Sequence, residues 1–332
     1  MTQARRVTAS FAGRFLALPS VCYVLACTPA AVAPPTAAPQ RAGHGVDGST
    51  TVTLDRTLVS PSGAESAEDL YRRAEAQQRA GEHAAALQSF ERLLSLDPGG
   101  RWEAPARLGA AIACDASSEE DALRERALQH LLVVLQRYPA SPEAAEAALR
   151  ATRLAAYLQH WDLAMTTTDA LLATHPTALS HRILAHGVRA LALLERGHVQ
   201  EAEPDLLRAV DLANSVADDL PDLIPADWAP AFFAAGESKR LASEAIVFVP
   251  VPKDFGAALE SRAQLLLDAQ REYSLVLRAR DSHWSTMAGV RIGEMYESLH
   301  QALMAIPPPP NADTPERRAL FEAALRLRYA VL

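Results

Sequence analysis

A chain of 332 residues is long enough for one extended array or two ordinary domains. The chain has a net charge of −8 and a pI of about 5.7, whereas nucleic-acid-binding proteins usually carry an excess of basic residues. A nucleic-acid partner is therefore disfavoured. Hydrophobic residues make up 49% but aromatic residues only 6%, because Ala and Leu, both strong helix formers, dominate. Runs of β-branched and aromatic residues at strand spacing are almost absent. The composition therefore predicts an all-α fold.

Residues 1–26 have the layout of a secretory signal. Arginines and no acidic residues occupy residues 1–14, and an apolar stretch follows over residues 15–26. A positive end followed by a short apolar core is typical of export signals. This core is too short to span a bilayer comfortably, and Pro19 interrupts it. We therefore expect residues 1–26 to be a signal peptide that takes no part in the fold.

The apolar stretch ends in Val24-Leu25-Ala26-Cys27, which resembles the bacterial lipoprotein box, although Leu25 is bulkier than the residue usual there. In that family the cysteine is acylated and becomes the mature N-terminus. The resemblance implies lipidation at Cys27 and, because Thr28 and not an aspartate follows, sorting to the outer membrane, facing the periplasm. Several acyl chains give stable anchoring. An ordinary signal peptide with an incidental cysteine is the alternative.

The segment over residues 27–65 is rich in Ala, Gly, Ser and Thr and contains four early prolines, namely Pro29, Pro34, Pro35 and Pro39. Nothing in it is periodic or apolar enough to bury a core. We expect a disordered tether there. Of the three cysteines, only Cys114 falls in the predicted folded body, where its small and apolar neighbours predict a buried thiol rather than a disulfide or a reactive group.

The segment over residues 67–100 carries the marks of a helical hairpin. Gly81 stands where a tight turn favours glycine, and Ala86 is small enough to let the second helix lie close to the first. Phe90 can fill the space between neighbouring hairpins, and Pro98 ends the second helix. The order of small residue, filler and closing proline predicts a unit that stacks on further units.

Three weaker units follow. Each keeps a small residue at the position of close helix packing, namely Ala127, Ala164 and Ala202. Pro139 and Pro176 close the second and third units, whereas the fourth ends at Asn214. In the third unit Gln159 takes the place of the turn glycine and Thr168 that of the aromatic filler. The repeats are therefore degenerate but recognisable.

This pattern resembles the tetratricopeptide repeat, most strongly over the first unit. The resemblance extends from residue 67 to about residue 306, with an array over 66–214 and extended hairpins over 215–306. It implies a right-handed α-solenoid whose concave groove, lined by the first helix of each pair, binds peptides or helices. Together with the lipid signal, it is similar to envelope lipoproteins that help to assemble outer-membrane proteins or surface machines. An Ala- and Leu-rich bundle that imitates the pattern is the alternative.

The C-terminal part varies the same theme. Long helices are predicted over 228–246 and 255–280, separated by a proline-containing break. The run from Ile292 to Tyr296 resembles the core of a first repeat helix. The final segment, 307–332, combines a proline linker with a helix that starts at Thr314-Pro315-Glu316. We expect this last helix to cap the open end of the stack.

No catalytic grouping stands out in the sequence. The histidines His175, His181 and His186 lack the spacing of a helical metal site, and nucleophile-elbow, phosphate-loop and dinucleotide glycine patterns are missing. We therefore expect no enzymatic activity, no cofactor and no metal. If a groove exists, repeat positions predict that five residues line it, namely Tyr71, Gln78, Arg79, Arg153 and Tyr157. Aromatic and arginine side chains are common interaction anchors.

The sequence thus predicts a non-enzymatic scaffold for protein or peptide partners, anchored by lipid in the bacterial envelope, that assists assembly of a membrane or surface complex. One alternative is a regulatory or carrier component of a cell-wall enzyme system. The other is a cytoplasmic adaptor whose N-terminus merely resembles a signal.

Overall fold

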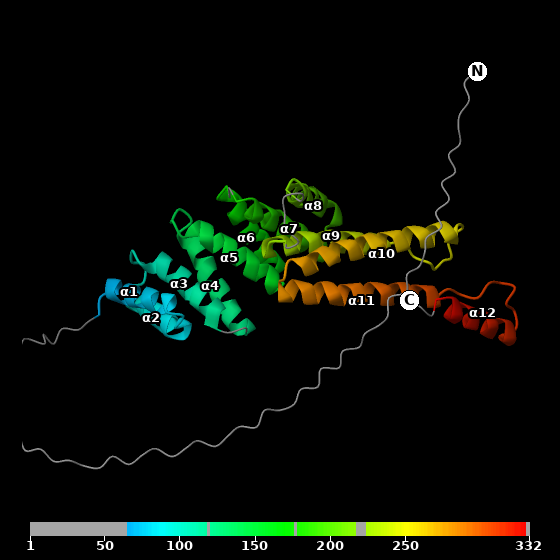
Figure 1. The fold of residues 1–332 in the computed structure, drawn as a ribbon, viewed down its shortest axis with the longest axis horizontal. Coiled ribbons are helices and arrows are strands. Elements are labelled where there is room, and N and C mark those ends of the chain that lie inside the picture. The colour runs from blue at the N-terminus through cyan, green and yellow to red at the C-terminus, as the bar shows by residue number, and fades with distance from the viewer. Residues whose placement is uncertain (1–64, 118–119, 176–177, 217–223, 330–332) are drawn as a thin grey trace, which may run out of the picture. The chain divides into compact units, whose positions relative to one another are not determined.

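The computed structural model describes residues 65–117, 120–175, 178–216 and 224–329, and within these ranges it contains helices and no strand (Figure 1). The first eight helices are α1 (Ala67–Arg79), α2 (His83–Leu96), α3 (Glu103–Ser117), α4 (Asp121–Arg137), α5 (Ala144–Tyr157), α6 (Trp161–Ala173), α7 (Leu179–Glu195) and α8 (Val199–Asn214). A 3₁₀ turn over Ala226–Trp228 leads into α9 (Ala229–Glu244), α10 (Phe255–Arg278), α11 (Ser282–Met304) and α12 (Pro315–Arg328). The predicted signal peptide, lipidation site and nearly all of the predicted tether lie outside the described residues.

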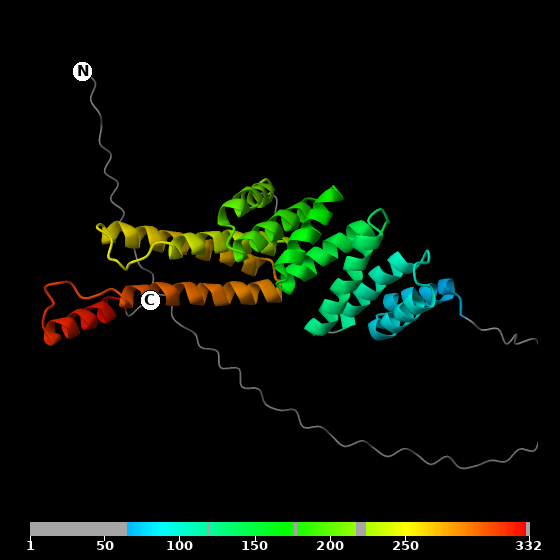
Figure 2. The same ribbon diagram turned by 180° about the vertical axis from the view of Figure 1, so that it is seen from behind.

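The helices from α1 to α8 form four hairpins that stack in chain order. Each helix packs against the next one, and α1 also contacts α3 as α5 contacts α7 (Figures 1 and 2). Stacked hairpins that bury their apolar faces against neighbours form an α-solenoid. The predicted fold class, an all-α solenoid of helical hairpins, is confirmed.

The first hairpin shows why its residues were predicted correctly. The Ser66 hydroxyl accepts a hydrogen bond of 3.1 Å from the Asp69 amide and caps α1. Gly81 forms the turn with a φ of +78°, which costs glycine little. Ala86 and Phe90 are buried, and the Phe90 ring lies where any side chain on Gly109 of α3 would have to go. The Phe90 side chain therefore packs between the first hairpin and the second.

The third hairpin uses other residues for the same roles. Gln159 adopts a φ of +57° at the turn between α5 and α6, the left-handed conformation that Gly81 supplies in the first hairpin. Thr168 is buried and satisfies its hydroxyl with a hydrogen bond of 2.6 Å to the Ala164 carbonyl. Both substitutions predicted from the sequence are confirmed, whereas Pro176 lies outside the described residues.

In the C-terminal part, α10 with 24 residues and α11 with 23 residues are longer than any helix of the array. α9 packs against both α7 and α10, and α10 and α11 run beside each other away from the hairpins (Figures 1 and 2). In the run from Ile292 to Tyr296, which resembles a repeat core, packing does not require a glycine at position 293, because a β-carbon there would meet no atom within 4 Å. Met295 is the buried residue of that run.

A buried charge network joins α7 of the last hairpin to α9, α10 and α11. Glu237 on α9 is 1% exposed and accepts a hydrogen bond of 2.6 Å from the Tyr273 hydroxyl on α10. Arg240 lies 2.6 Å and Arg291 of α11 lies 3.0 Å from its carboxylate oxygens. Burial and the nearby Glu237 charge raise the pKa of Glu195 on α7, although Arg291 opposes them. The network ties the long C-terminal helices to the last repeat.

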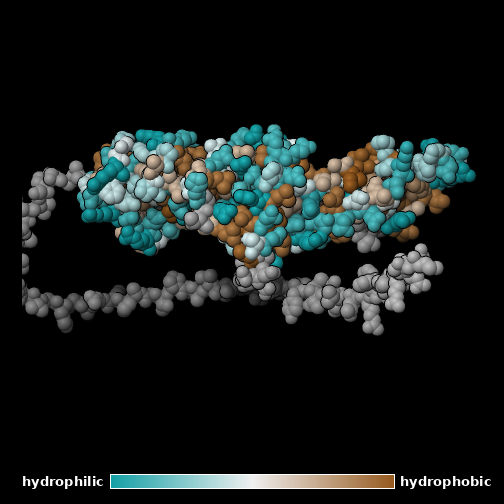
Figure 3. Space-filling model, turned by 90° about the horizontal axis from the view of Figure 1, so that it is seen from above, coloured by the Kyte–Doolittle hydropathy of each residue, from teal (hydrophilic) through white to brown (hydrophobic). Residues whose placement is uncertain are grey.

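Cys114 on α3 is fully buried, as predicted, and burial together with the nearby Asp115 charge raises the pKa of its thiol to about 11. Across the part of the chain that the structure describes, no helix combines the length and hydrophobicity needed to cross a membrane. The surface in view in Figure 3 is mixed, with hydrophobic patches at the centre of the molecule and in the right half, where α10 to α12 lie.

Candidate protein-binding cleft

A cleft of about 450 Å³ opens where the third hairpin meets the C-terminal helices. Its walls come from α3, α4, α5, α7, the 3₁₀ turn, the start of α9 and the start of α11. The lining residues are Asp115, Arg124, Arg153, Leu154, Ala156, Tyr157, Leu184, Pro225, Ala226, Asp227, Pro230, Asp281 and Trp284. Apolar walls with a few charged groups of both signs are typical of sites that bind a ligand in one orientation.

Arg153 is fixed in this cleft by a two-point ion pair. Its Nε and Nη2 atoms each donate a hydrogen bond of 2.8 Å to the carboxylate of Asp227 in the 3₁₀ turn. Such a fork-to-fork pair restrains both side chains. The Arg153 side chain nevertheless remains 41% exposed, so part of the guanidinium faces the solvent in a fixed orientation.

A second group of side chains stacks at the other wall. The Tyr157 ring of α5 and the His283 ring of α11 lie 3.9 Å apart, and the guanidinium of Arg124 lies 4.3 Å from the centre of the Tyr157 ring. His283 also contacts Trp284 edge-on, with ring centres 5.1 Å apart. These contacts dock the start of α11 against the end of α5.

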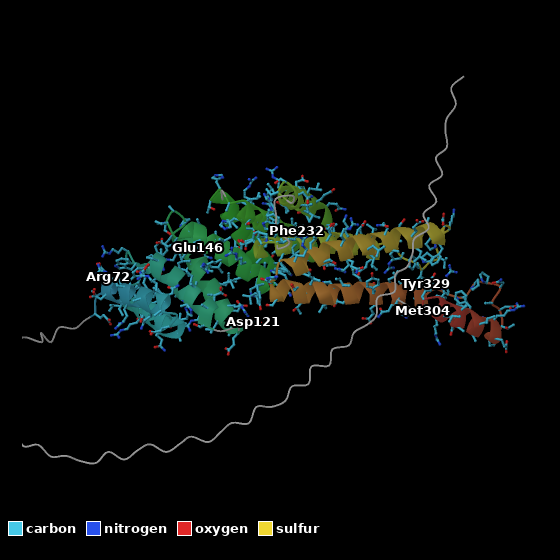
Figure 4. The ribbon with its side chains drawn as sticks, viewed as in Figure 1. Arg72, Asp121, Glu146, Phe232, Met304 and Tyr329 are labelled. Carbon is cyan, nitrogen blue, oxygen red and sulfur yellow. The ribbon has the colours of Figure 1, made fainter. Side chains whose placement is uncertain are left out.

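Burial lowers the pKa of His283, although the Asp281 charge opposes this effect. Arg124 lowers it further, and Asp121 at the start of α4 raises it. Figure 4 shows Asp121 on the side of the array where α11 begins. The imidazole is therefore neutral at neutral pH, and it stacks on Tyr157 as an uncharged ring.

The five predicted groove residues fall into two groups. Arg153 and Tyr157 line the cleft together. Tyr71, Gln78 and Arg79 lie on α1 and do not line it. Their role in binding stays a prediction.

On α1, the Tyr71 ring stacks on Trp102 at 4.5 Å, and its hydroxyl donates a hydrogen bond of 3.2 Å to Glu75. Burial and the Glu75 charge raise its pKa to about 12. Arg79 pairs with the same carboxylate at 2.8 Å. These contacts lie within the first hairpin and at its border with α3, so they serve packing there.

The sequence reasoning missed most residues of the cleft, notably Asp227 and Trp284, and it also missed His283, which stacks on the cleft residue Tyr157. Asp227 lies 74 positions after Arg153, so they meet only through tertiary packing, which sets the 3₁₀ turn against α7. The tryptophan that follows the predicted long helix over 255–280, Trp284, was the one available signal. His186, considered above among possible metal ligands, instead pairs through Nδ1 with the buried Asp205 at 2.7 Å.

Comparison with known proteins bears on the first hairpin most directly. A solved tetratricopeptide repeat protein from Parabacteroides merdae ATCC 43184 is similar over 79% of this chain and 98% of its own, with 12% sequence identity and a TM-score of 0.41. Among curated proteins no match was found. The family model described as tetratricopeptide repeat matches residues 70–100, the stretch that contains most of α1 and all of α2.

Proposed function

We propose that this protein is a non-enzymatic scaffold that holds a segment of a partner protein in the cleft beside α5. The observation that carries the proposal is that Arg153 and Tyr157 of α5 and Trp284 of α11, residue types common among interaction hot spots, line one cleft. The cleft is set into stacked hairpins, and a rigid site loses little entropy when it binds.

The charges of the cleft indicate the kind of segment that it takes. Asp115, Asp227 and Asp281 contribute negative charge, and Arg124 and Arg153 contribute positive charge, around apolar walls. A volume of about 450 Å³ accommodates a few side chains rather than a folded domain. We therefore expect a short segment with one bulky apolar side chain flanked by polar groups of both signs.

Site-specific photocrosslinking in the cells that make the protein tests this proposal. A benzophenone amino acid placed at Asp115, on the rim of the cleft, is expected to capture a discrete partner from the full-length chain. The same amino acid at Glu203, exposed on α8 and away from the cleft, is the matched control. Identical products at both positions, or none at either, would reject the cleft as the binding site.

We further propose that the scaffold is anchored in the bacterial envelope through Cys27, on the periplasmic side of the outer membrane, and assists assembly of a membrane or surface complex. The lipoprotein-like sequence before Cys27 and the proline-containing segment after it support this. Membrane fractionation of Cys27→Ala should move the protein to the soluble fraction, whereas Cys22→Ala, in the same apolar stretch, should not. Equal membrane association of both variants would count against anchoring.

A further inference from the structure

Helix α12 presents an outward apolar stripe formed by Leu320, Ala323 and Leu327. Leu320 is 70% exposed and Leu327 is 82% exposed, the two highest values among the large hydrophobic residues that the structure describes. The spacing of three, four and seven residues places them on one face of a helix. A stripe of this width matches the seam between two packed helices.

The opposite face of α12 rests only lightly on the body. Phe321, Leu325 and Tyr329 are half-buried, and none of the described residues of α12 is fully buried. A mainly apolar cleft of about 350 Å³ separates these side chains from Val251 and Phe255. Figure 4 shows Tyr329 and Met304 at the junction of α12 with α11. The helix therefore contacts the body mainly through these three side chains, and its other faces are exposed.

The charges of α12 distinguish it from the rest of this acidic chain. It contains four arginines and two glutamates. On a regular helix, Arg317 and Arg328 follow one side of the apolar stripe and Arg326 lies toward the other side. Arg317 is already paired with Asp313 at 2.7 Å, and Arg326 lies 3.8 Å from Glu322. The flanks are positive overall, so acidic groups on an occupant would be attracted.

We propose that α12 is the docking site for an amphipathic helix of another protein that carries acidic residues beside its apolar stripe. A second copy of this chain fits less well, because two α12 helices would bring positive flanks together. A lipid surface also fits less well, since helices that lie in a membrane bury a broad apolar face. Here Arg317 and Arg328 divide the outer stripe from Phe321 and Leu325.

Binding of designed peptides to the full-length chain tests the proposal. The probe is a labelled helix of three heptads, about 21 residues, with Leu at the seam positions and Glu at the flanking positions, and its counterpart has Lys at the flanks. Fluorescence anisotropy should show the acidic probe binding at least about tenfold more tightly than the basic one. Equal binding of the two probes, or no binding of either, would overturn the proposal.

Variants at exposed positions locate the site without disturbing the fold. The double variant Leu320→Gln with Leu327→Gln should weaken binding of the acidic probe about tenfold or more. The matched control Leu207→Gln, at a leucine that is 56% exposed on α8, should leave it unchanged. Arg328→Glu should reduce the ratio of the affinity for the acidic probe to the affinity for the basic probe. An equal loss in the Leu207 variant would overturn the assignment to α12.

Two further measurements separate the other occupants. Sedimentation should show the same oligomeric state for the wild type and the Leu320 and Leu327 double variant, and self-association lost only in that variant would indicate a second copy instead. Flotation with phosphatidylglycerol vesicles should be unaffected by the double variant after the lipid anchor is removed with Cys27→Ala. Flotation that depends on the two leucines would indicate a membrane surface. Neither outcome depends on the cleft beside α5, which crosslinking at Asp115 tests separately.

Discussion

Gly187 on α7 and Ala231 on α9 approach so closely that a β-carbon at position 187 would lie 2.7 Å from the backbone nitrogen and α-carbon of Ala231. Backbone atoms cannot move aside as a flexible side chain can. Gly187→Ala should therefore lower the free energy of unfolding by about 2 kcal/mol, because the strain outweighs the better helix propensity of alanine. Urea unfolding followed by circular dichroism measures the change.

The matched control is Gly293→Ala on α11, where the added β-carbon meets no atom within 4 Å. There only helix propensity changes, so the free energy of unfolding should rise by about 0.5–1 kcal/mol. A destabilised Gly293 variant, or a stable Gly187 variant, would contradict the packing described for these helices.

The buried carboxylate of Glu237 should be the most sensitive charged group of the C-terminal helices. Glu237→Gln removes the negative partner of Arg240 and Arg291, and breaking a buried ion pair leaves charges uncompensated. We expect the free energy of unfolding to fall by about 3 kcal/mol. The control Glu294→Gln removes a half-exposed partner of Arg291 and should cost less than about 0.5 kcal/mol. Equal effects of the two changes in guanidinium unfolding would contradict this.

The Arg153–Asp227 pair should contribute modestly, because the arginine is 41% exposed and solvent screens its charge. A double-mutant cycle with Arg153→Ala and Asp227→Ala should give a coupling energy of about 1 kcal/mol, read from thermal or urea unfolding. The coupling should fall in high salt. A coupling of zero at low salt would show that the two-point geometry is not maintained in solution.

The free energy of unfolding should decrease as the pH falls, because of His130 on α4. Burial, followed by the charges of Arg107 and Arg126, lowers the pKa of His130 from 6.5 to about 4. The unfolded chain therefore takes up a proton between these values while the folded chain does not, so protonation favours unfolding. The contribution is fully present above pH 6.5 and is lost as the pH falls toward 4. The free energy of unfolding should decline less steeply between pH 6.5 and 5 in His130→Leu than in the wild type, and parallel curves would refute the assignment.

The features that could be predicted from the sequence are local ones. Gly81 and Gln159 mark turns because the backbone needs a left-handed residue between two adjacent helices, and Ala86 and Phe90 mark the packing positions of a single hairpin. Their contacts lie within one hairpin or reach only the next one along the chain, as between Phe90 and Gly109. For the same reason the hairpins, their order and the all-α solenoid class followed from the sequence.

The cleft depended on contacts that no local pattern encodes. Tyr157 meets His283 only because the turn between α10 and α11 returns to the end of α5, and no periodicity specifies where a long hairpin will dock. For the same reason the sequence did not reveal the packing contact of Tyr71, whose repeat position predicts a groove residue. The indole of Trp102, at the start of the next hairpin, covers its ring.

The length of α11 has a consequence for how partners could be arranged. Trp284, near its first turn, belongs to the cleft beside α5, and α12 follows shortly after its last turn. A helix of 23 residues spans about 34 Å. One continuous helix would thus fix the interval between two bound proteins, so both could be held at once without competing. Inserting two turns into α10 and α11 together should move the outer partner about 11 Å farther away while leaving each contact surface intact.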